Sequence, residues 1–106
     1  MQVIIKARHT EVASDIKDYA QKKIAEKAEQ FIDANDDSII CEIEFDDQFG
    51  NRDGLDKRVD VTMTLPHEHL PLHIEQVGET YQAAIDIAAD RLDKALTRYK
   101  ETQKHL

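Results

Sequence analysis

Residues 80–104, TYQAAIDIAADRLDKALTRYKETQK, decide the fold of this 106-residue chain. Their apolar residues recur with a period near 3.6, and neither glycine nor proline interrupts them, which predicts one long amphipathic helix. The expected buried face consists of Tyr81, Ala84, Ile85, Ala88, Leu92, Ala95, Leu96 and Tyr99. A helix with one apolar face needs a surface to cover, and the preceding residues must supply it.

Strands are predicted in four segments before this helix, because apolar and polar residues alternate there. The segments are residues 2–9, 39–45, 58–65 and 70–76. The alternation points these side chains inward: Val3, Ile5, Ala7, Ile39, Cys41, Ile43, Phe45, Val59, Val61, Met63, Leu65, Leu70, Leu72 and Ile74. Residues 46–57 are rich in Asp, Asn and Gly, which predicts a hairpin loop between two of the strands.

A second helix is predicted over residues 14–32, with Ser14 as its N-cap and Asp15 and Asp18 near its positive end. Its apolar face is Ile16, Ala20, Ile24, Ala28 and Phe31. The order β-α-β-β-β-α predicts an α+β fold with a four-stranded sheet and both helices on one face. The first two strands are expected to be parallel, and the last three to form an antiparallel meander. We expect a single domain over residues 1–106.

Composition excludes several classes of protein. Hydrophobic residues make up 41% and charged residues 34%, which is typical of a globular, soluble chain rather than a disordered one. No apolar run reaches the roughly 20 residues of a membrane span, and residues 1–6 do not have the pattern of a secretion signal. One cysteine, Cys41, excludes an internal disulfide and indicates a small core residue in a reducing, cytoplasmic setting.

The net charge of −8 is unevenly distributed. Residues 33–79 carry three Lys/Arg against thirteen Asp/Glu, whereas residues 1–32 and 80–106 each have a net charge of +1. The acidity therefore lies in the middle of the chain, and the two helices carry most of the cations. This asymmetry leaves room for a basic surface on an acidic protein.

Basic residues flank the apolar faces of both predicted helices. Arg91, Lys94 and Arg98 lie on one flank of the second helix, while Asp86, Asp90 and Asp93 fall on its far side. Lys23 and Lys27, with Tyr19 beside them, lie at the edge of the first helix. If these edges line the valley between the helices, they form a phosphate-binding groove. The competing interpretation is a solvated flank with intrahelical pairs such as Asp90–Lys94.

Motifs for catalysis and metal binding are weak in this sequence. His67, Glu68, His69 and His73 are more typical of exposed loop histidines than of a metal site. Residues 46–56 lack the spacing of a calcium loop, and the sequence has no glycine-rich phosphate loop or nucleophile elbow. We therefore expect no enzymatic activity, no cofactor, no metal and no small-molecule substrate.

Residues 78–86 and 90–100 resemble the signature of the ribosome hibernation promoting factor family, also called ribosome-associated inhibitors or sigma-54 modulation proteins. Residues 57–65 and 18–23 are similar to further family segments, so the resemblance covers nearly the whole chain. It implies the β-α-β-β-β-α fold, laid out like a double-stranded-RNA-binding domain. The chain ends just after the last helix and resembles a short form, which by this likeness does not pair ribosomes unaided.

The resemblance also implies a function. Members bind the small ribosomal subunit near the decoding centre, block messenger and transfer RNA, and hold idle ribosomes inactive. It implies RNA phosphate contacts for Arg91, Lys94, Arg98, Lys100 and Lys23, and Lys27 lies one residue beyond the family's second basic position on the first helix. The expected partners are the small subunit and its rRNA, with no membrane. The alternative is a protein-interaction module that has lost RNA binding and uses acidic residues 46–56.

Overall fold

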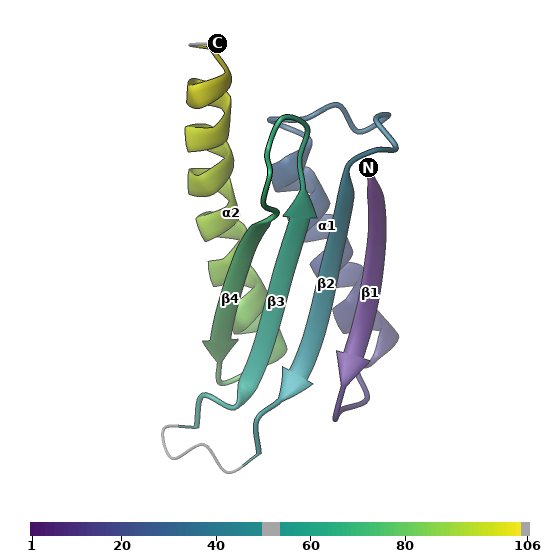
Figure 1. Cartoon of the computed structure of the whole chain (residues 1–106). Helices are drawn as coiled ribbons and strands as arrows, with labels where there is room; N and C mark the ends of the chain where they lie inside the picture. Colours follow the sequence, from purple (N-terminus) through teal and green to yellow (C-terminus); the bar gives the residue numbers. More distant parts are fainter. Residues whose placement is uncertain (50–53, 105–106) are drawn as a thin grey trace.

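The computed structural model describes residues 1–49 and 54–104. Its elements are β1 (Gln2–Arg8), α1 (Ser14–Ala28), β2 (Ile40–Asp47), β3 (Lys57–Thr64), β4 (Leu72–Gly78) and α2 (Tyr81–Lys104). The strands form one sheet in the order β1-β2-β3-β4, with β1 and β2 parallel and the other neighbours antiparallel. Both helices lie behind the sheet in Figure 1, so the expected α+β architecture is confirmed.

An aliphatic core fills the space between the sheet and the helices. Alternate residues of β2 and β3 are fully enclosed, namely Cys41, Ile43, Phe45, Val59, Val61 and Met63. The helices meet them with Ala20, Ile24, Ala28, Ala84, Ile85, Ala88, Ala89, Leu92 and Leu96. Burial raises the pKa of the Cys41 thiol to about 12, so this side chain stays neutral as a core residue.

The start of α2 is fixed by close packing against the end of β4. The Thr80 hydroxyl accepts a hydrogen bond from the backbone N–H of Ala83 at 3.0 Å, which caps the helix. A Cβ at Gly78 would lie 3.0 Å from the backbone nitrogen of Ala84. A side chain at this position would crowd the backbone of Ala84, which favours glycine at the turn that brings α2 back over β3 and β4.

The first helix differs from its prediction at both ends. It ends at Ala28 rather than at residue 32, although Phe31 and Ile32 still pack against the core from the following turn. Ala13 is the N-cap and makes no side-chain capping bond, so the prediction of Ser14 as N-cap is wrong. Asp15 occupies the first turn as expected, and its carboxylate accepts a hydrogen bond from the N–H of Ile16 at 3.0 Å.

Strand ends account for the remaining differences. The last strand begins at Leu72, and Leu70, expected to point inward, is 80% exposed. Pro71 explains this, because its ring removes a backbone donor and restricts the residue before it. Ala7 keeps the expected phase, since it lies opposite Phe45, but at the end of the edge strand it is exposed. β2 continues to Asp47, so the predicted loop over 46–57 is shorter, and residues 50–53 lie outside the described part of the chain.

Candidate nucleic-acid interface

The basic residues of the helices lie on two separate surfaces. Arg91, Lys94 and Arg98, which we call the groove cations, line a groove along β4 together with His73 and Ile74. Lys23 and Lys27, the seam lysines, lie instead where α1 meets α2. The expectation that both sets line one valley between the helices is therefore wrong.

The direction that each flank of α2 faces explains this separation. Its apolar face packs against β3, β4 and α1, which leaves one flank toward α1 and the other toward β4, the edge strand of the sheet. Asp86 and Asp93 lie on the flank that faces α1, and the groove cations lie on the flank beside β4. Of the three carboxylates expected on the far side of the helix, Asp86 and Asp93 thus line the seam, while Asp90 is exposed.

Arg91 is held in the groove by neutral acceptors. Its Nη1 donates hydrogen bonds to the backbone carbonyl of Glu75 at 2.6 Å and to Oε1 of Gln76 at 3.0 Å. These contacts fix the guanidinium against the edge of β4 without cancelling its charge. An orientated cation that keeps its charge is well placed to meet an anion.

Lys94 and Arg98 are exposed on the same flank of α2. Within residues 1–49 and 54–104 neither side chain has a carboxylate within ion-pair distance, and the pair Asp90–Lys94 is not formed. Lys100 is exposed too, but it lies about half a turn around the helix from Arg91 and outside the groove. The structure thus brings together three of the four predicted α2 cations.

The seam lysines are neutralised by α2. Lys23 Nζ lies 3.5 Å from Oδ1 of Asp86, and Lys27 Nζ lies 3.3 Å from Oδ2 of Asp93. The Tyr19 hydroxyl donates a hydrogen bond to the same oxygen of Asp86, and Lys23 Nζ lies 5.8 Å from the centre of the Tyr19 ring. Tyr19 first, and Asp86 second, raise the pKa of Lys23 above its usual value. These two lysines already have anionic partners before any ligand arrives.

One exposed cation was missed by the sequence interpretation. Lys22 borders a shallow hollow on α1 with Tyr19, Lys23 and Glu26, and it makes no ion pair within the described residues. Its neighbour Lys23 was selected because it lies nearer the apolar face of the helix. Lys22 is exposed, whereas Lys23 and Lys27 of the same helix have carboxylate partners.

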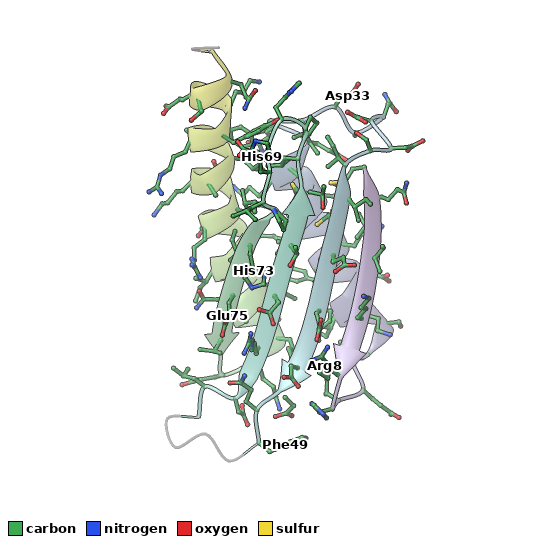
Figure 2. The ribbon with its side chains drawn as sticks, viewed as in Figure 1. Arg8, Asp33, Phe49, His69, His73 and Glu75 are labelled. Atoms are coloured by element: carbon green, nitrogen blue, oxygen red, sulfur yellow. The ribbon has the colours of Figure 1, made fainter. Side chains whose placement is uncertain are left out.

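Part of the acidic middle of the chain lies on the face of the sheet opposite the helices. Outward-facing carboxylates of β2, β3 and β4 include Glu42, Glu44, Asp60 and Glu75, on the open face that Figure 2 presents to the viewer. Lys6 and Arg8 of β1 pair with Glu42 and Glu44 at 3.5 Å and 3.0 Å. The helix side and the open face of the sheet therefore differ in charge.

The candidate histidines divide between two places. His67 and His69 lie exposed in the turn before β4, whereas His73 projects from β4 near Asp60 and Glu75. Figure 2 labels both His73 and Glu75 on that strand.

Across the described part of the chain, no helix has the length and apolar character that crossing a membrane requires.

Two solved structures share this fold. The N-terminal domain of Thermus thermophilus Protein Y superposes with a TM-score of 0.72 at 24% identity, covering 93% of this chain and 99% of that one. A ribosomal subunit interface protein from Coxiella burnetii gives a TM-score of 0.73 at 20% identity, covering 95% and 99%. The class defined by the fold is thus a β-α-β-β-β-α domain of the Protein Y type.

Sequence comparison identifies the family. Residues 3–104 match the family described as Sigma 54 modulation protein / S30EA ribosomal protein, and the chain belongs to it. The Ribosome hibernation promoting factor of Pseudomonas putida is 31% identical over 106 residues, which cover all of this chain and 93% of that protein. The factor of the same name from Azotobacter vinelandii is 27% identical over 103 residues, covering 97% and 86%. The family and these relatives indicate a ribosome hibernation factor.

Proposed function

We propose that this protein inhibits translation by binding small-subunit ribosomal RNA near the decoding centre, where it blocks messenger and transfer RNA. The proposal assigns it a binding role without catalysis, as one domain acting in the cytoplasm. The groove cations are its central contacts with RNA phosphates. Lys100, Lys23 and Lys27 are peripheral contacts.

The observation that carries this proposal is the charge state of the groove. Three cations are gathered beside β4, and the described residues provide no carboxylate partner for them, although the chain as a whole has a net charge of −8. Clustered Lys and Arg neutralise phosphates and release counterions, which is the main source of affinity for nucleic acid. Side chains held at a helix flank recognise the shape of a folded RNA rather than its sequence.

The position of the acidic residues is compatible with this orientation. Glu42 and Glu44 project from the open face of the sheet, away from the helices, and pair with cations of β1. An RNA that approaches the groove therefore meets the basic flank of α2 before the anionic strands. Repulsion by the sheet limits binding in other orientations.

Charge reversal tests the proposal directly. The triple variant R91E/K94E/R98E should lose co-sedimentation with small subunits, whereas E42K/E44K should retain it. The double variant K94E/R98E, which leaves the Arg91 contacts to β4 intact, should show the same loss, and its circular dichroism spectrum should match that of the wild type. Normal co-sedimentation of R91E/K94E/R98E and of K94E/R98E would overturn the assignment. Recovery of a basic protein partner through residues 46–56, with no ribosome binding at low salt, would favour the protein-interaction alternative.

A further inference from the structure

We propose that Asp60, His73 and Glu75 form a binding site for a divalent first-row transition-metal ion, best matched by Zn²⁺, on the open face of the sheet. The site lies on β3 and β4, and His73 is the one residue that it shares with the lining of the groove. One ligand atom from each of these residues lies within 4.8 Å of the others. A histidine nitrogen with two carboxylate oxygens is a donor set that Zn²⁺ accepts.

The register of the sheet creates this cluster. Asp60 lies opposite Glu75, and Thr62 lies opposite His73, so all four side chains project from the same face of adjacent strands. Side chains directly opposite each other in an antiparallel pair have Cβ atoms about 5 Å apart, close enough to share one ion. Strands hold such positions more rigidly than loops do.

His73 is orientated by a partner on its other nitrogen. Its Nδ1 lies 2.9 Å from the Thr62 hydroxyl oxygen, and its Nε2 lies 3.3 Å from Oδ1 of Asp60. In the tautomer whose Nδ1–H donates to Thr62, the Nε2 lone pair faces the Asp60 carboxylate and is free to bind a metal ion; in the other tautomer, Nε2–H donates to Asp60. Metal-bound histidines use their second nitrogen in this way. The test must therefore separate metal binding from a hydrogen bond between Nε2–H and Asp60.

Arg58 contacts both carboxylates of the cluster. Its Nε donates to Oδ2 of Asp60 at 2.9 Å, and its Nη1 lies 3.1 Å from Oε1 of Glu75. The two carboxylates carry a total charge of −2 and Arg58 offsets only half of it, so the cluster attracts a dication. The guanidinium competes with the metal for the same oxygens, which predicts that removing it tightens binding.

The spacing fits a metal after a small adjustment. Ligand atoms at about 2.1 Å from one ion are separated by at most about 4.2 Å, slightly less than the observed spread. The Glu75 and His73 side chains are 52% and 49% exposed, so they are able to rotate inward, and solvent fills the remaining coordination positions. The nitrogen ligand disfavours Mg²⁺ and Ca²⁺, which prefer oxygen.

Calorimetric titration of the full chain with Zn²⁺ tests the site. The H73Q variant should weaken binding by more than about a hundredfold, because losing a ligand costs more than losing a second-shell partner. The R58Q variant should tighten binding by about tenfold, since two surface ion pairs no longer compete. The matched control H69Q, an exposed histidine outside the cluster, should bind as the wild type does.

A second readout keeps the proposal falsifiable if H73Q folds poorly. The T62V variant should weaken Zn²⁺ binding by about tenfold, and Co²⁺ should give visible absorption bands that H73Q abolishes. Zn²⁺ binding that is equal in wild type, H73Q and T62V would overturn the site. So would the absence of binding to both wild type and R58Q at about 1 mM metal.

Discussion

Cations lie on both sides of α2, but their partners differ: the groove cations belong to α2 itself, whereas the seam lysines belong to α1 and face aspartates of α2. On the β4 side, the groove cations contact only neutral groups or solvent within the described residues. On the α1 side, the seam lysines each have an aspartate at 3.5 Å or less. The two sides of α2 therefore differ chiefly in whether their cations already have an anionic partner.

The physical reason lies in what each cation gives up on binding. In the proposed RNA complex, a groove cation exchanges mobile counterions for a phosphate, and the release of those ions drives association. A seam lysine must share or leave its aspartate, so the phosphate replaces a contact that already exists. Surface ion pairs of this kind are worth up to about 1 kcal/mol, so they reduce the contribution of these lysines without abolishing it.

Neutralising the two sets separately should give the largest contrast. The variant K94Q/R98Q should lose roughly 10- to 100-fold in affinity for isolated small subunits at low salt, because two phosphate contacts disappear. The variant K23Q/K27Q removes the same charge and should lose less than about fivefold. Filter binding of both variants with labelled subunits measures the contrast, and equal losses would remove the distinction between the flanks.

Releasing the seam lysines should give a smaller effect of opposite sign. The variant D86N/D93N leaves Lys23 and Lys27 without their partners, so affinity for small subunits should rise by about two- to fivefold. The control D90N/E101Q removes two exposed carboxylates of the same helix that hold no lysine in the described structure. A gain in the control equal to that of D86N/D93N would show that only total charge matters.

A titration of Lys23 should give the smallest and most local effect. Its pKa is raised chiefly by Tyr19 and then by Asp86, so the ion pair persists below pH 10.5 and is lost as pH rises through the folded-state value. Both Y19F and D86N should bring this pKa down toward 10.5, as measured by NMR of the lysine side chain. An unchanged value in both variants would contradict the described seam.

Most of the fold was predictable because the apolar pattern of each segment and the order of the segments indicate the same architecture. The alternation around Cys41 and Val59 and the helical period from Tyr81 onward each have one physical solution, and the sheet and helices need each other to cover their apolar faces. Element ends were less predictable. The last strand begins only after Pro71, so Leu70, which is apolar and in phase with the strand, is exposed.

The candidate site was only partly predictable, for a geometric reason. A helical wheel places Arg91 and Asp86 relative to the apolar face of α2, but it does not say which flank faces α1. That depends on which strands each helix covers, a property of the whole fold. The grouping of Arg91, Lys94 and Arg98 was therefore correct, and the valley assigned to them together with Lys23 and Lys27 was wrong.

The salt dependence of small-subunit binding tests the central claim most directly. Arg91, Lys94, Arg98 and Lys100 have no carboxylate partner in the described structure, and four phosphate contacts predict a log–log slope of about −2.8 to −3.6 for the wild type. The slope should fall to about −1.4 to −1.8 in K94Q/R98Q and stay within about 0.5 of the wild type in K23Q/K27Q. A slope that falls as far in K23Q/K27Q, or does not change in K94Q/R98Q, would contradict the account.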